Sequence, residues 1–221
     1  MKTKNALVIV DVTNDFTDPK GTLYVKNGEK IIDNINKLID STLFDFIIMV
    51  QETHPQNHLW FASNHEGKKI FEQIEINGNI ETLWPDHVVE NTWGAEIYPK
   101  LKDKLTSLKD GYYIFNKGLN PNAHPYSPFQ DPDSGILEFL NEQDISTTII
   151  VGLATDYCIK DTAIDSSKYF KTFVVTDAIE AVNIQSTDGE NAINVMKKDC
   201  VMVTSDQIID VLQDNPLENC R

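Results

Sequence analysis

The sequence has few cysteines and no long hydrophobic run. Its 221 residues include only three cysteines, which lie far apart at positions 158, 200 and 220. An odd number of scattered cysteines argues against a disulfide framework and favours reduced thiols in a reducing compartment. The apolar run at residues 6–10 is too short to cross a membrane, and no signal-peptide cleavage site follows it. We therefore expect a cytoplasmic protein without a membrane partner.

Basic residues are also scarce. Lysine and arginine number 19 against 34 aspartates and glutamates, which gives a net charge of -15. A chain of this charge repels phosphate backbones, and the lysines at 100–109 are diluted by acidic and apolar residues. We therefore expect no nucleic-acid partner. The length suffices for one core and repeats are absent, so we predict one domain over residues 1–221, with homo-oligomerisation left open.

Six short apolar runs alternate with helical patterns. The runs are apolar on both faces, as buried parallel strands are, and occupy residues 6–11, 44–50, 112–115, 147–152, 172–176 and 201–203. Helical spacings separate them, over residues 26–39, after 131–134, and over 156–169 and 189–198. This alternation predicts a three-layer α/β/α, doubly wound fold around a mainly parallel six-stranded sheet.

One long irregular segment interrupts the alternation at residues 53–110. It is rich in Asn, Gly, His and Pro and has only weak helical patterns, at 68–76 and 98–108. All five histidines lie inside it or just after it, at positions 54, 58, 65, 87 and 124. Long irregular segments in compact domains are usually functional. We expect this one to form a lid and to supply metal ligands.

Reactive residues follow the predicted strands at one edge of the sheet, where open α/β sheets place their sites. Asp11 closes the first strand, Lys117 follows the third, and Cys158 lies in the first turn of the helix after the fourth. A helix N-terminus and an ammonium group both favour a thiolate, and a carboxylate accepts the thiol proton. Each residue alone has a structural explanation, as a turn aspartate, a solvated lysine or a buried thiol. Together they favour a nucleophilic site.

A metal site is also indicated. Glu52 and His54 are two apart on an extended segment, so their side chains share a face, and His87 is available as a third ligand. Mixed carboxylate and imidazole ligands suit zinc, iron or manganese, and we expect one divalent ion, zinc before the other two. Ordinary surface polarity is the alternative. His58 is expected behind these ligands or facing the substrate, and His65 at the surface.

The motifs resemble one known family. In chain order they are DVTNDF at 11–16, HPQNH at 54–58, LWPDH at 83–87, NTWGAE at 91–96, KG at 117–118, YSPF at 126–129 and GLATDYC at 152–158. The chain from the first strand to about residue 177 is similar to the nicotinamidase branch of the isochorismatase-like cysteine hydrolases. The first and last motifs mark the superfamily. The acid-x-His pair and the Trp-Pro-x-His element are more specific for the branch.

The resemblance implies an activity and a set of roles. The activity is hydrolysis of nicotinamide to nicotinate and ammonia through a cysteine thioester in NAD salvage, with pyrazinamide as a further substrate. The implied triad is Asp11, Lys117 and Cys158, and the implied metal ligands are Glu52, His54 and His87. A cis peptide is implied between Leu153 and Ala154, and an oxyanion hole at the backbone N–H groups of Ala154 and Cys158. The residues implied to contact the substrate are Phe16, Trp84, Tyr126, Leu153 and Ala154.

The chain departs from the family pattern in several places. Glu52 stands where aspartate is usual, Thr13 where glutamine is usual, and His124 and Pro125 precede the tyrosine at 126. The segment at 62–82 is longer than expected and predicts a larger lid. Two alternatives stay open. One is a metal-independent amidohydrolase for another small amide, such as an N-carbamoyl or ureido compound, and the other is a non-catalytic binding protein on the same fold.

Overall fold

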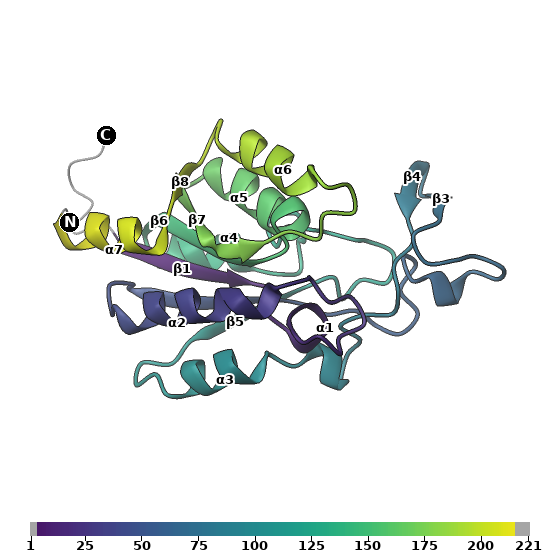
Figure 1. Ribbon diagram of the computed structural model, residues 1–221, viewed down its shortest axis with the longest axis horizontal. Helices are drawn as coiled ribbons and strands as arrows, with labels where there is room; N and C mark the ends of the chain where they lie inside the picture. The colour runs from purple at the N-terminus through teal and green to yellow at the C-terminus, as the bar shows by residue number, and fades with distance from the viewer. Residues whose placement is uncertain (1–3, 215–221) are drawn as a thin grey trace.

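The computed structural model describes residues 4–214, and a parallel sheet of six strands forms its centre (Figure 1). The strand order is β5-β2-β1-β6-β7-β8. The bounds are β1 Lys4–Val10, β2 Phe46–Glu52, β5 Tyr113–Lys117, β6 Ile145–Leu153, β7 Lys171–Glu180 and β8 Val201–Val203. All six predicted strands are confirmed. The order reverses between β1 and β6, and doubly wound sheets bind ligands at this switch point, beyond the carboxyl ends of the strands.

Helices cover both faces of the sheet, which confirms the three-layer prediction (Figure 1). The helices on one face are α2 Ile32–Asp40, α3 Pro99–Thr106 and α7 Ser205–Asp214; those on the other are α4 Ile136–Glu142, α5 Lys160–Ser167 and α6 Asp188–Met196. The short α1 (Asn14–Thr17) and α7 were not predicted. The signal for α7 is present in the sequence, because Ile208 and Leu212 are four residues apart and both are buried in the core.

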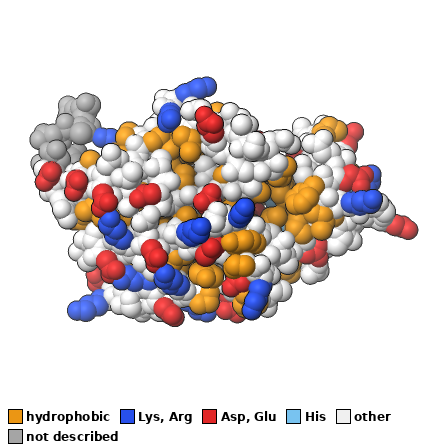
Figure 2. All heavy atoms as spheres, viewed as in Figure 1, with side chains coloured by type: hydrophobic (Ala, Val, Ile, Leu, Met, Phe, Trp, Pro, Cys, Tyr) orange, Lys and Arg blue, Asp and Glu red, His pale blue; other side chains and the backbone are white. Residues whose placement is uncertain are grey.

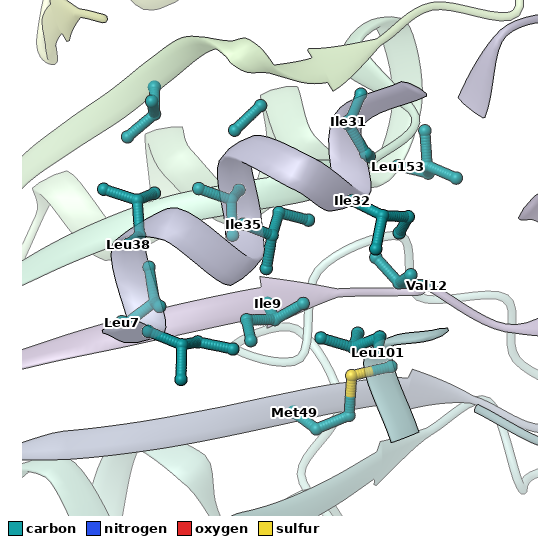
Figure 3. Close-up of a cluster of buried hydrophobic side chains, with 14 of the residues drawn as sticks. Leu7, Ile9, Val12, Ile31, Ile32, Ile35, Leu38, Met49, Leu101 and Leu153 are labelled. Carbon is teal, nitrogen blue, oxygen red and sulfur yellow. The ribbon is translucent and has the colours of Figure 1, made fainter. Parts of the chain in front are cut away.

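The core explains why β1 is a rigid platform. Leu7 and Ile9 point into the cluster under α2, whereas the alternate residues of β1 point into the cluster on the other face. Figure 3 shows Ile35 and Leu38 of α2 lying against this strand. All four of these side chains are fully buried. Each such burial contributes about 1.5–3 kcal/mol, so the strand end that follows is held firmly.

The segment at 68–76 is not a helix, so that prediction was wrong. Strand β3 (Gln73–Ile76) pairs antiparallel with β4 (Asn79–Thr82) in a hairpin. Asn77 and Gly78 form the turn, with φ angles of 53° and 83°. An Asn-Gly pair between alternating residues is a strong hairpin signal, which the weak helical spacing obscured. The hairpin lies at the right of Figure 1, on the side toward which the strands point, and its Ile76 is buried in the same cluster as Trp84.

Several short turns complete the described chain. They are η1 Gly28–Ile31, η2 Ala62–Asn64, η3 Trp93–Ala95 and the π-helical η4 Thr155–Ile159. Within residues 4–214, none of the helices combines the length and apolar character needed to cross a bilayer. Figure 2 shows acidic and basic side chains interspersed over the visible face, with hydrophobic side chains gathered at its middle and right. Cys220, the last of the three cysteines, lies outside the described residues.

Candidate active site

Two neighbouring strand ends bring Asp11 and Lys117 together. Asp11 directly follows β1 with a left-handed φ of 54°. Its N–H donates to Val50 O at 2.9 Å, and its Oδ1 accepts the N–H of Glu52 at 2.8 Å. Lys117 is the last residue of β5 and is in register with Glu52, the last residue of β2. Side chains in register on parallel strands project from the same face, so Lys117 lies beside Glu52.

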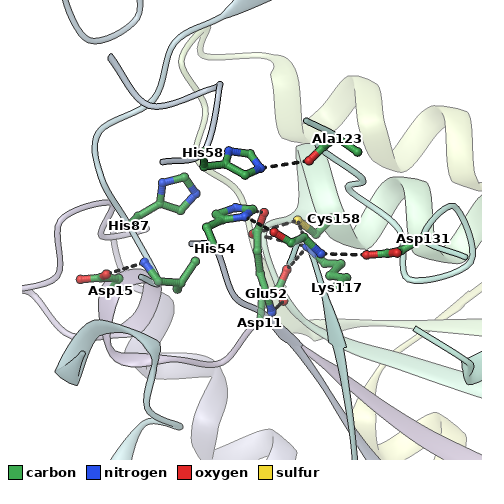
Figure 4. Close-up of polar contacts among 12 residues, drawn as sticks. Asp11, Asp15, Glu52, His54, His58, His87, Lys117, Ala123, Asp131 and Cys158 are labelled. Carbon is green, nitrogen blue, oxygen red and sulfur yellow. Dashed lines mark hydrogen bonds and ion pairs between the residues drawn. The ribbon is translucent and has the colours of Figure 1, made fainter. Parts of the chain in front are cut away.

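Lys117 is the centre of a buried ionic cluster. Its side chain is fully buried. Its Nζ lies 3.1 Å from Asp11 Oδ2 and 3.3 Å from Glu52 Oε2. The same Nζ lies 3.5 Å from the Sγ of Cys158, which in turn lies 3.9 Å from Glu52 Oε2 (Figure 4). One ammonium group therefore contacts two carboxylates and a thiol in a site that excludes bulk water.

Burial sets the protonation of this cluster. Burial alone would lower the pKa of Lys117. The nearby Asp11, Cys158 and Glu52 have a larger, opposite effect and hold that pKa well above its usual value. Burial raises the pKa of Asp11 to about 6, with Lys117 opposing the change. Burial also raises the pKa of Cys158 well above that of a free thiol. Lys117 favours the thiolate, as the sequence indicated, whereas burial and the two carboxylates favour the thiol in the resting site.

The backbone after β6 turns sharply to present Cys158. Gly152 has a φ of 119°, and a Cβ there would lie 2.1 Å from Val10 O, so no other residue fits between β6 and β1. The peptide bond between Leu153 and Ala154 is cis, as the resemblance implied. Cys158 is the second-last residue of the turn η4 that follows, and it lies beside the end of β1.

Glu52, His54 and His87 form a buried group suited to a metal ion. One ligand atom from each lies within 4.8 Å of the others. His54 Nδ1 donates to Gly118 O at 2.8 Å and His87 Nδ1 donates to Pro85 O at 2.7 Å, so each Nε2 keeps its lone pair. Backbone carbonyls commonly orient metal-bound histidines in this way. Burial lowers the pKa of His87 to about 4, which keeps it neutral and able to bind a metal.

The contact between Glu52 and His54 supports the same interpretation. Glu52 Oε1 lies 3.0 Å from His54 Nε2. When the imidazole is neutral, two acceptors face each other there, and a cation between them relieves the repulsion. Burial alone would raise the pKa of Glu52, but the ammonium group of Lys117 holds it well below its usual value. The carboxylate is therefore charged, and the residues present fit a divalent ion.

Gly118 and Asp131 support His54 from behind. Gly118 has a φ of 82°, and a Cβ there would lie 2.6 Å from Cε1 of the His54 ring. Asp131 Oδ2 accepts the N–H of Gly118 at 2.8 Å and fixes the loop (Figure 4). Neither supporting role was predicted. The Lys-Gly pair at 117–118 was visible in the sequence, but the need for glycine appears only when the imidazole is in place.

A cavity opens above these groups. Its walls include all five residues expected to contact the substrate: Phe16, Trp84, Tyr126, Leu153 and Ala154. Asp11, Glu52, His87 and Cys158 also line it, whereas Lys117 and His54 lie behind the surface. The structure thus gathers every predicted site residue around one mainly apolar cavity with charged groups at one side. A mainly apolar cavity with a few convergent polar groups is typical of a small-molecule site.

Other residues at the site were not predicted. Leu23, Val25, Tyr157 and Val182 line the cavity as well, and nothing in their local sequence patterns singles them out. His124, noted only as unusual, is a further wall residue. His58 is fully buried behind His54 and is not in the wall; the ring centroids of the two histidines are 4.0 Å apart.

The comparisons with known proteins agree with this geometry. The isochorismatase domain model matches residues 5–207. The nicotinamidase of Acinetobacter baylyi is 41% identical over 82% of this chain and 84% of its own. Among solved structures, an Acinetobacter baumannii nicotinamidase pyrazinamidase has a TM-score of 0.84 and 36% identity, covering 93% of this chain and 98% of its own. A Pyrococcus horikoshii pyrazinamidase in complex with zinc has a TM-score of 0.73 and 29% identity, with 91% and 99% covered.

The family model covers most of the sequence, and the relative from Acinetobacter baylyi exceeds 40% identity over most of both chains. The chain therefore belongs to the isochorismatase family.

Proposed function

We propose that the protein is a nicotinamidase, which hydrolyses nicotinamide to nicotinate and ammonia and so serves NAD salvage. The observation that carries this proposal is the juxtaposition of Cys158 Sγ, Lys117 Nζ and the Asp11 carboxylate beside an aromatic-walled cavity. The name of the similar Acinetobacter proteins supports the substrate. Pyrazinamide, which carries the same carboxamide on a similar ring, is the second substrate we propose.

The first half of the reaction forms a thioester. Since burial keeps Cys158 as a thiol, its proton moves to Asp11 as Sγ attacks the carboxamide carbon. The C–S bond forms and the carbonyl electron pair moves to oxygen. We assign the stabilisation of this oxyanion to the backbone N–H groups of Ala154 and Cys158, and loss of one such donor typically costs roughly a hundredfold in rate. Asp11 then gives its proton to the departing nitrogen, the C–N bond breaks, and ammonia leaves.

The second half releases the acid. A water molecule attacks the thioester carbon and gives a proton to Asp11, and the C–S bond breaks. The thiolate of Cys158 takes that proton back, so the site returns to its starting state. Lys117 keeps its charge throughout and balances the negative charge that moves between Asp11 and the sulfur. Because its pKa is held well above its usual value, Lys117 is a fixed positive charge rather than a proton carrier.

The metal ligands in this proposal are Glu52, His54 and His87. A divalent ion held there would supply a Lewis acid that binds the ring nitrogen of the substrate and draws electron density from the ring. The zinc in the Pyrococcus horikoshii relative supports zinc for this protein, with iron or manganese as alternatives. Glu52 is a longer ligand than the aspartate usual in the family, but its carboxylate still reaches His54.

We further propose that the chain forms one domain and acts in the cytoplasm. The two described cysteines, Cys158 and Cys200, are both free thiols, which suits a reducing compartment. The ligand we propose is a small molecule, and the cavity described above offers enough wall contact for one flat ring.

Ammonia release from nicotinamide tests the proposal. We expect purified protein to release ammonia, to stop after rigorous chelation, and to recover when zinc, iron or manganese is returned. Cys158→Ala should abolish release, and Cys200→Ala is the matched control because this second buried thiol lies outside the site. Folded protein that releases no ammonia with any of these metals would rule out nicotinamide as substrate. Turnover by Cys158→Ala would rule out the covalent mechanism.

A further inference from the structure

A second group of ring nitrogens lies next to the first metal set. One nitrogen each from His54, His58 and His124 lies within 4.8 Å of the others. The rings are held in place: the His124 ring stacks on Trp60, with centroids 5.4 Å apart and an interplanar angle of 18°. The ring of Tyr126 is nearly perpendicular to that of His124, with centroids 4.8 Å apart. Packing, rather than solvent exposure, therefore brings the three imidazoles together.

The hydrogen bonds indicate which nitrogens of these rings keep a lone pair. His58 Nε2 lies 2.9 Å from Ala123 O, which can only accept, so Nε2 carries the hydrogen and Nδ1 keeps a lone pair (Figure 4). His58 Nδ1 is buried and has no hydrogen-bond partner among residues 4–214. His124 Nδ1 is likewise buried without a partner in the described chain. His54 keeps its lone pair on Nε2, since its Nδ1 donates to Gly118 O.

Buried polar atoms without partners are costly, at about 1–3 kcal/mol each, and folded proteins rarely keep two of them side by side. Here both belong to imidazoles, which bind transition metals when they are neutral. The neighbouring third imidazole is already oriented by a backbone carbonyl. Three imidazoles are also the ligand number of a common zinc-site type, in which a fourth position stays open.

We propose that His54, His58 and His124 form a second metal position, which takes ions that prefer imidazole ligands. An ion there excludes an ion at the position formed by Glu52, His54 and His87. His54 has one free nitrogen, so it serves only one ion at a time. The fully imidazole set favours zinc, cobalt, nickel or copper over manganese, which prefers carboxylate and water oxygens. His124 lines the substrate cavity, so an ion at this position still lies at the wall of that cavity.

The competing explanation is that one bound water donates to the unpaired nitrogens. A bound water satisfies two acceptors as an ion does. If water is the natural occupant, however, the protein should no longer bind zinc once Glu52 and His87 are replaced. Zinc binding by a variant that lacks the ligand atoms of Glu52 and His87 therefore distinguishes the two explanations. Metal binding is measured without substrate, so the result does not depend on whether the protein hydrolyses nicotinamide.

The experiment titrates metal-free protein with zinc, cobalt or manganese, using calorimetry for affinity and cobalt absorption for ligand geometry. The starting variant is Glu52→Gln with His87→Gln, which leaves only His54 from the first set. We expect it to bind one zinc or cobalt ion per chain and no manganese. Adding His124→Phe, which keeps the ring stack but removes the nitrogens, should weaken zinc binding more than about a hundredfold, the upper range for changes beyond the direct ligands.

His65→Phe in the same background is the control, because His65 bonds Leu59 O outside the group and should leave zinc affinity unchanged. Circular dichroism and melting temperature establish that each variant is folded. If the double variant does not fold, His87→Gln alone gives the same comparison with and without His124→Phe. A folded starting variant that binds no zinc, or zinc binding that survives His124→Phe, would overturn the proposal.

Discussion

Replacing Lys117 with methionine should destabilise the protein strongly and in a pH-dependent way. Methionine fills a similar volume but removes the ammonium group that lies 3.1 Å from Asp11 Oδ2 and 3.3 Å from Glu52 Oε2. All three side chains are at least 97% buried, so water does not replace the lost contacts. Removing one partner of a buried ion pair typically costs about 3–5 kcal/mol. For a chain of this size, that corresponds to a melting temperature lower by about 6–20 °C.

The pH dependence follows from the carboxylates left behind. In the intact protein, Lys117 helps to hold the pKa of Glu52 well below its usual value. The ion pair therefore stabilises the folded protein fully when the pH is above the usual pKa of glutamate. This stabilisation is lost as the pH falls through the lowered pKa of Glu52. Without the ammonium group, burial raises the pKa of both Glu52 and Asp11 above their usual values. Their ionisation then destabilises the fold as pH rises. The difference between variant and intact protein should therefore widen from pH 5 to pH 8.

Urea unfolding with excess chelator measures this difference, because a bound metal would otherwise compensate the charge of Glu52. Lys37→Met is the matched control: its ion pair with Asp206 is exposed, and its loss should change stability by less than about 1 kcal/mol at either pH. If Lys117→Met were as stable as the control at pH 8, the cluster would not depend on its buried ammonium group, and the electrostatic reasoning would be wrong.

Three further predictions concern the same site. The kcat/KM for ammonia release should fall as pH drops through about 6, since Asp11 must be ionised to accept a proton; a flat profile down to pH 5 would exclude it as the base. Gly118→Ala should lower zinc affinity in a titration, because its methyl group would lie 2.6 Å from the His54 ring, whereas Gly111→Ala, also at positive φ but in open space, should not. Glu52→Asp should speed alkylation of the active-site thiol in metal-free protein at pH 7, because the shorter carboxylate withdraws from a sulfur now 3.9 Å away.

Much of the site could be predicted because strand ends are visible in the sequence. Asp11 and Lys117 directly follow or end apolar runs, and the carboxyl ends of parallel strands meet at one edge. The sequence does not contain the register, however. That Glu52 lies opposite Lys117 depends on β2 and β5 being neighbours in the sheet and on the offset between them, neither of which was predicted. The salt bridge between them was therefore not predicted.

Two other features required the folded chain. The pKa of Cys158 depends on burial, which outweighs Lys117, and burial is a property of packing rather than of neighbours in sequence. His124 enters the site because the chain after β5 returns over His54, where the two rings stack with centroids 5.5 Å apart. The sequence marks this histidine only as unusual, since a loop position carries no periodicity from which its direction could be inferred.

Glu52 joins the two polar groups of the site. Its Oε1 contacts His54, one of the proposed metal ligands, while its Oε2 contacts Lys117, in the ionic cluster with Asp11 and Cys158. An aspartate at this backbone position would be shorter by about 1.5 Å, one carbon–carbon bond, and could not keep both contacts at 3.0 and 3.3 Å. The unusual glutamate therefore links the two groups. An ion held at Oε1 would draw electron density from the same carboxylate that faces Lys117 and the sulfur of Cys158, so in the proposed mechanism this one side chain would couple metal binding to the nucleophile.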